Sequence, residues 1–235
     1  MGQGHNAPVP MSQKPQFKNA ERQQLSILTP LEKKTLKWLA ERMPAWVNSD
    51  HLTLLGFVGM FLVGLSYYLA RSNPNFLLVA IVCFAINWFG DSLDGTLARY
   101  RNRQRPRYGF YVDHIVDAFG ITFVLAGFGL SGYMSPSVAM AFLIAYFLVN
   151  IEIYLATYTI GVFKLSYGIM GPSEMRVIVC IGNLVLLVKP TVKIAGNSFL
   201  LADVSGVVGA VVLVAIAIVS SIKNTRRLYN EERLP

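Results

Sequence analysis

Four aspartates lie close together in a chain that is otherwise dominated by apolar residues. They are Asp91, Asp94, Asp113 and Asp117, and spacings of three and four residues place each pair on one face of a helix. Carboxylates grouped without histidine or cysteine are the ligands that magnesium, manganese and calcium prefer. The cluster therefore predicts a divalent metal site, with Mg²⁺ or Mn²⁺ as the expected cofactor and two ions bridged by a shared carboxylate.

Residues without bulky side chains accompany both pairs of aspartates. Gly95 and Ala98 extend the face that carries Asp94, and Gly109 stands one turn before Asp113. So little side-chain volume predicts that a large group approaches the carboxylates here. The loop between the two pairs is short, so we expect their helices to be antiparallel neighbours whose acidic faces meet at one depth.

A simpler interpretation treats the four aspartates as helix caps and ion-pair partners at a membrane surface. An ionised aspartate near hydrocarbon costs on the order of a few kcal/mol, and repulsion between neighbouring carboxylates adds to that cost. The arginines of the series from 99 to 107 lie in the loop, at or beyond the helix end. Four carboxylates in two facing pairs therefore favour the metal site.

The elements that position these residues are membrane-spanning helices. Of 235 residues, 54% are hydrophobic and 14% are charged, and the mean hydropathy is +0.46, which is outside the range of ordinary soluble domains. We therefore predict an all-α, polytopic membrane protein with six transmembrane helices and an amphipathic surface helix before them. The expected spans are 51–70, 75–98, 109–133, 136–160, 174–188 and 203–222.

The chain divides into four expected segments. Residues 1–28 are polar and predict a disordered tail. Thr29, Pro30 and Glu32 form a capping box that predicts a helix start, and the resulting amphipathic interfacial helix covers 29–45. Residues 46–225 are the six-helix domain, and 226–235 are a cytoplasmic tail.

Basic residues predict the orientation of these helices. The net charge is +8, and most lysines and arginines fall at one end of the spans. The positive-inside rule then puts both termini and the acidic cluster at the cytoplasmic side of an integral membrane protein. This distribution also excludes nucleic acid as a partner, because no basic face with interleaved aromatic residues is present. Cys83 and Cys180 lie singly in apolar runs and predict neither a disulfide nor a zinc site.

Eight residues within 27 positions resemble the signature of the CDP-alcohol phosphotransferase family of membrane enzymes in phospholipid synthesis. They are Asp91, Asp94, Gly95, Ala98, Arg99, Gly109, Asp113 and Asp117. The resemblance implies that a CDP-alcohol, with CDP-diacylglycerol as the expected donor, transfers its substituted phosphoryl group to an acceptor alcohol and releases CMP. It also implies a homodimer surrounded by membrane lipids.

The resemblance also implies roles for the signature residues. Asp91, Asp94 and Asp113 would bind the metal, and Asp117 would be a ligand, the general base, or both. Gly95, Ala98, Arg99 and Gly109 would contact the nucleotide and its phosphates. Family members often carry Pro-Asn-x-x-Thr at the start of the first span; here Ser49 and Asp50 replace Pro-Asn before Thr53, which weakens a nucleotide role for Thr53.

Several polar residues outside the signature have two interpretations each. Arg105 and Arg107 are possible contacts to the acceptor or to lipid, whereas for Arg101 and Arg103 we favour a topological role. Glu152 either hydrogen-bonds inside the bundle or lines the acceptor pocket. Segment 171–176 resembles a Gly-Pro-x-Glu stretch of some aminoalcohol phosphotransferases, and is otherwise a helix start.

Two other functions compete with phosphotransfer. A membrane prenyltransferase also uses aspartates and magnesium on a diphosphate, but its two acidic motifs lie far apart rather than in one helical hairpin. A non-enzymatic cation carrier would need polar groups through the full depth of the bilayer. The sequence does not identify the acceptor alcohol.

Overall fold

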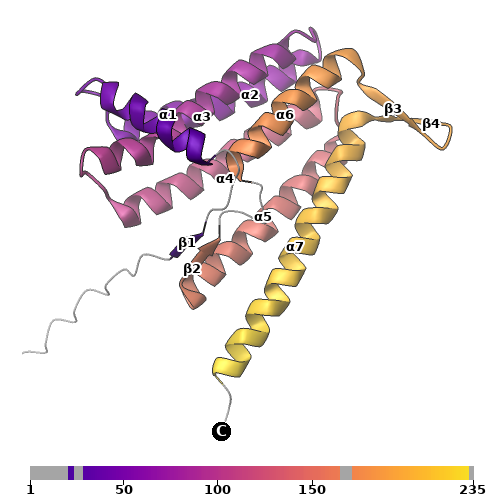
Figure 1. The fold of residues 1–235 in the computed structure, drawn as a ribbon. Coiled ribbons are helices and arrows are strands. Elements are labelled where there is room, and N and C mark those ends of the chain that lie inside the picture. Colours follow the sequence, from indigo (N-terminus) through magenta and orange to yellow (C-terminus); the bar gives the residue numbers. More distant parts are fainter. Residues whose placement is uncertain (1–20, 24–28, 165–170, 233–235) are drawn as a thin grey trace, which may run out of the picture.

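The described part of the protein forms a bundle of seven helices with two short strand pairs (Figure 1). The computed structural model describes residues 21–23, 29–164 and 171–232. The helices are α1 (Thr29–Arg42), α2 (Ser49–Ala70), α3 (Phe76–Tyr100), α4 (Pro106–Leu130), α5 (Pro136–Ile160), α6 (Pro172–Val188) and α7 (Leu201–Glu231). The strands are β1 (Glu21–Gln23), β2 (Val162–Lys164), β3 (Thr191–Ile194) and β4 (Asn197–Leu200).

The predicted all-α membrane fold is confirmed. Each expected span corresponds to one of α2 to α7, and five of these helices, all except α6, are long and apolar enough to cross a bilayer. α6 has 17 residues, or about 25 Å at 1.5 Å per residue, which is near the lower limit for a span. The count of six spans therefore remains a prediction.

α2 packs closely against both α3 and α4 and holds them in place. A Cβ atom on Gly90 would stand 2.5 Å from the backbone of α2 at Leu52 and Gly56. A Cβ atom on Gly127 would stand 1.9 Å from the carbonyl oxygen of Gly64. Glycine at these positions therefore lets the helix backbones touch.

The acidic faces of α3 and α4 meet as expected, but the two helices pack mainly on α2 and not on each other. Both helices approach α2 much more closely than they approach one another. The reason is the distribution of glycine, since Gly56 and Gly64 of α2 meet glycine-containing stretches of both partners. The acidic faces of α3 and α4 consequently face each other across a space instead of being closed by direct packing.

The amphipathic helix α1 lies across the end of the bundle that carries the acidic residues (Figure 1). Its Leu36 and Ala40 are buried and pack with Leu93 and Leu97 of α3. Lys33, Lys34 and Lys37 are exposed on its other side.

Arg101 fixes the connection from α1 to α2, because its guanidinium donates to the carbonyl oxygens of residues 43–45 and 47. Arg101 therefore has a structural role in addition to the topological role that the sequence predicts for it.

Two small strand pairs were not predicted from the sequence. β1, which lies within the expected N-terminal tail, pairs in parallel with β2 after α5. The rest of that tail, 1–20 and 24–28, lies outside the described residues. β3 and β4 form an antiparallel hairpin through Ala195 and Gly196, both of which have positive φ. This hairpin lies beside the start of α7, at the end of that helix opposite the C-terminus (Figure 1).

The crossing of α2 and α3 gives a direct test of the packing. We expect Gly90→Ala to lower the free energy of unfolding by about 1–3 kcal/mol or to prevent folding, because the added methyl group has no space between two backbones. Thermal unfolding in detergent measures the effect. Gly182→Ala on α6 is the matched control, since its Cβ would meet no atom within 4 Å in the part of the chain that the structure describes. Equal melting temperatures for both variants would contradict the close crossing.

Candidate metal and phosphotransfer site

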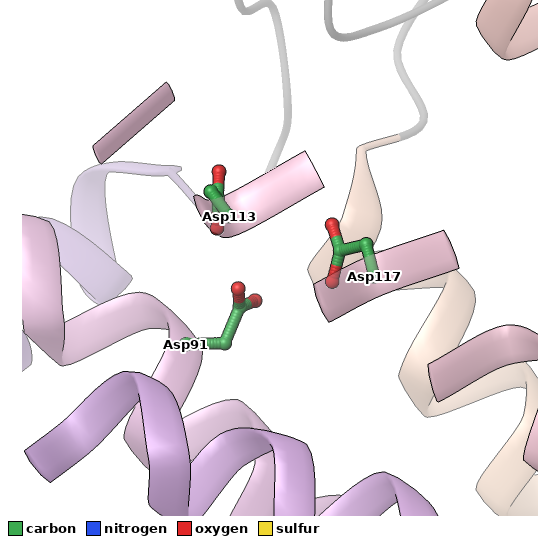
Figure 2. Close-up of side chains that lie close together, drawn as sticks. All are labelled: Asp91, Asp113 and Asp117. Carbon is green, nitrogen blue, oxygen red and sulfur yellow. The ribbon is translucent and has the colours of Figure 1, made fainter. Parts of the chain in front are cut away.

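Three of the four aspartates come together between α3 and α4. Asp91 lies on α3, Asp113 and Asp117 lie one turn apart on α4, and one oxygen of each is within 4.8 Å of the others. Figure 2 shows the three carboxylates facing a common space. Each residue is partly buried. The helical spacing predicted from the sequence thus produces a convergent acidic cluster.

The cluster has the chemistry and the size of a site for a hard cation. Carboxylate oxygens are the preferred ligands of Mg²⁺, and an ion with ligands at about 2.1 Å spans about 4 Å between opposite oxygens. The three aspartates also line a small cavity together with Thr53, Gly56 and Asn87, among others. Its volume is about 10 Å³, which is roughly the space of one water molecule. These residues therefore fit a bound divalent ion.

Asp94 occupies a different position from the other three aspartates. Its carboxylate accepts a hydrogen bond from Thr53 Oγ1 at 2.6 Å and another from the backbone N–H of Gly95. The neighbouring Ser49 donates to the carbonyl oxygen of Asp94 at 2.7 Å. The first turn of α2 therefore holds Asp94 in place, and Thr53 contacts this carboxylate in the described structure.

Sequence reasoning missed the residue that faces the acidic cluster from α6. The guanidinium of Arg176 forms an ion pair with Asp91, and both side chains are largely buried. Arg176 Nε also donates to Asn87 Oδ1 at 3.0 Å, and Asn87 Nδ2 donates to the carbonyl of Gly56 at 3.0 Å. One signal was available, because Asn87 is a polar residue in an apolar span, four positions before Asp91 and on its face.

The small residues of the signature border open space. Among the described residues, a Cβ atom on Gly109 would meet nothing within 4 Å, and one on Gly95 would meet only the guanidinium of Arg99. Neither glycine is needed for helix packing, in contrast to Gly90. Ala98 is partly exposed, and the exposed Arg99 donates to Thr96 Oγ1 at 3.0 Å. This side of the helices is therefore accessible to a ligand.

The remaining candidate residues lie outside the carboxylate cluster. Arg105 is exposed and pairs with Asp50, whose hydrogen bond raises the pKa of the guanidinium above its ordinary value. Arg107 is also exposed. Glu152 accepts a hydrogen bond from Asn224 of α7 at 2.6 Å, which supports the first of its two interpretations.

A larger cavity adjoins the cluster between α4 and α5. Its volume is about 190 Å³, and its lining is mostly apolar. It is lined by Ala118, which directly follows Asp117 in the sequence, and by Tyr146, Phe147, Asn150, Ile151 and Tyr154. A substrate group can therefore be accommodated next to Asp117.

This chain is similar to known proteins of one family. Residues 46–222 match the family model of the CDP-alcohol phosphatidyltransferases. An archaetidylinositol phosphate synthase of Pyrococcus horikoshii is 28% identical over 166 residues, which cover 70% of this chain and 85% of the relative. The matched region contains the carboxylate cluster, the five helices from α2 to α6 and most of α7.

Proposed function

The chain belongs to the CDP-alcohol phosphatidyltransferase family, and from this premise we propose that it transfers a phosphatidyl group from CDP-diacylglycerol to an acceptor alcohol and releases CMP. Membership makes the protein an integral membrane enzyme that transfers a phosphatidyl-type group from a CDP-alcohol, rather than a prenyltransferase or a cation carrier. The observation that carries the proposal is the convergence of Asp91, Asp113 and Asp117 on one cavity.

The reaction requires one bond to form and one to break at phosphorus. The acceptor oxygen would bond to the phosphorus that carries diacylglycerol, and the bond from this phosphorus to the diphosphate bridging oxygen would break, leaving CMP. We assign Asp91, Asp94 and Asp113 to the divalent cation, which when bound would neutralise the diphosphate charge. Asp117 would take the proton of the acceptor hydroxyl and could also hold the ion.

Other residues of the site would orient the donor. Gly95, Ala98 and Gly109 would let the nucleotide lie against α3 and α4, while Arg99 would contact its phosphates. Arg176 is a further candidate for a phosphate contact, because Asn87 holds its guanidinium at the cluster independently of Asp91. The cavity between α4 and α5 gives room for a substrate group beside Asp117.

The orientation and assembly complete the proposal. The basic residues of α1, of the α3–α4 connection with the first turn of α4, and of the C-terminal part of α7 support cytoplasmic termini and an active site that faces the cytoplasm. We also propose a homodimer, as the family resemblance implies, and two bound ions. Arg105 and Arg107 remain proposed contacts to the acceptor or to lipid, whereas for Glu152 the hydrogen bond from Asn224 favours a structural role over the expected acceptor contact.

An acceptor panel tests the proposed function. Purified protein is incubated with CDP-diacylglycerol and Mg²⁺ or Mn²⁺, and CMP release is measured with glycerol phosphate, inositol phosphate, serine or an aminoalcohol. The name of the Pyrococcus relative places inositol phosphate first in this panel. We expect one acceptor to produce CMP and a new phospholipid in equal amounts. Activity with a CDP-aminoalcohol and none with CDP-diacylglycerol would overturn the proposed donor.

Gly109→Ala separates a ligand-binding role from a packing role. We expect an unchanged melting temperature, because the added methyl group meets no atom of the described residues within 4 Å, but about tenfold higher KM for the CDP-linked donor. Steady-state kinetics and thermal unfolding measure the two effects. Gly182→Ala, which is equally unhindered but lies on α6, is the control. An unchanged KM would remove Gly109 from the nucleotide site.

A further inference from the structure

Glu32 of the surface helix α1 makes contacts that its position in the sequence does not explain. One oxygen, Oε1, accepts hydrogen bonds from Trp88 Nε1 at 2.9 Å, Ser92 Oγ at 3.2 Å and Ser173 Oγ at 2.7 Å. Trp88 and Ser92 belong to α3, and Ser173 belongs to α6. A single carboxylate therefore joins three helices that are distant in sequence.

The residues that donate to Glu32 lie next to the two residues of the Arg176–Asp91 ion pair, on both α3 and α6. Ser92 directly follows Asp91, and Ser173 stands one turn before Arg176. On α3, Trp88 and Ser92 form one i, i+4 pair, while Asn87 and Asp91 form the adjacent one. The Glu32 contacts and the contacts of Arg176 thus link the same turns of α3 and α6.

We propose that Glu32 is a positioning residue, which fastens the start of α6 to α3 so that Arg176 reaches Asp91 and Asn87. α6 depends on such a link because it is the shortest of the helices α2 to α7. Hydrogen bonds to a charged acceptor are stronger than neutral ones, and three donors share this acceptor. The surface helix is thereby a structural part of the site. The catalytic part of this proposal rests on the proposed function.

Tryptophan fluorescence tests the contact without any activity measurement. The chain has three tryptophans, so Trp38→Phe with Trp46→Phe leaves Trp88 as the reporter. In this background we expect Glu32→Ala to shift the emission of Trp88, because its indole N–H loses its acceptor. Glu32→Gln retains an acceptor oxygen and should give a smaller shift. Glu41→Ala, an exposed carboxylate on the same helix, is the control and should give none. An unchanged emission spectrum in Glu32→Ala would overturn the contact.

A double-mutant cycle tests whether Glu32 acts through Arg176. We expect Glu32→Ala to raise the KM of the donor about tenfold with a smaller change in kcat, and Glu32→Gln to restore most of the loss. In an Arg176→Ala background, Glu32→Ala should have little additional effect. Ser173→Ala is a milder change that should produce part of the rise in KM. It replaces Glu32→Ala in the cycle if that variant fails to fold. The same double-mutant cycle can be measured with melting temperatures instead of KM values, and this version remains valid if CDP-diacylglycerol is not the donor.

Additive losses in the two backgrounds would overturn the positioning role. Such a result would show that Glu32 stabilises α1 alone and leaves Arg176 in place. Equal loss of activity in Glu32→Ala and Glu41→Ala would also overturn the positioning role, since the loss would then result from the reduced negative charge of α1 and not from the contacts of Glu32. Failure of the acceptor panel, in contrast, would leave the fluorescence and melting-temperature results unaffected, so the two proposals fail separately.

Discussion

Asp117→Asn is expected to reduce kcat by about 10³-fold or more while the protein still folds and binds nucleotide. Replacing the carboxylate with an amide removes the group that would accept the acceptor's proton, and such a loss typically costs 10²–10⁴-fold. Asp117 also lies within the cluster and beside the cavity between α4 and α5. CMP release under saturating donor measures the loss.

The nucleotide-binding measurement makes this test specific. Calorimetry with CMP or a CDP-alcohol should give an affinity close to that of the unmodified protein. Glu231→Gln, an exposed carboxylate of α7 paired with Arg227, is the control and should keep full activity. Full turnover in Asp117→Asn would remove this residue from the chemistry. Loss of nucleotide binding together with turnover would make Asp117 a binding residue instead of the base.

Removal of divalent ions is expected to have an effect of similar size. Excess EDTA should lower CMP release by about 10³-fold or more, since the charge of the diphosphate would no longer be neutralised as the bond breaks. Added Mg²⁺ or Mn²⁺ should restore activity. Ion binding should also raise the melting temperature, because a ligand of the native state stabilises it.

Direct binding of Mn²⁺ distinguishes a metal effect on the protein from one on the substrate. Electron paramagnetic resonance of Mn²⁺ with purified protein gives the affinity and the number of ions without turnover. We expect weaker binding in Asp91→Asn and in Asp113→Asn, whose carboxylates form the cluster, and unchanged binding in Glu231→Gln. Activity that survives the chelator would exclude the metal from the reaction.

Local features of the chain were predictable from the sequence because they depend on spacing along one helix. Apolar runs of about 20 residues set the helices and the membrane class. Spacings of three and four residues placed Asp91 with Asp94 and Asp113 with Asp117 on shared faces. The signature residues then indicated the family that the comparison over 46–222 confirms.

Only the tertiary structure decided which of these faces meet and what else reaches them. The closest packing is between α2 and its partners, because glycines such as Gly56 and Gly90 allow backbone contact, and this leaves α3 and α4 facing each other across the site. Asp94 is held by Thr53, while Arg176 reaches Asp91 from a position 85 residues later in the chain. Helical periodicity determines directions within one helix, whereas contacts between helices depend on the packing of all of them at once.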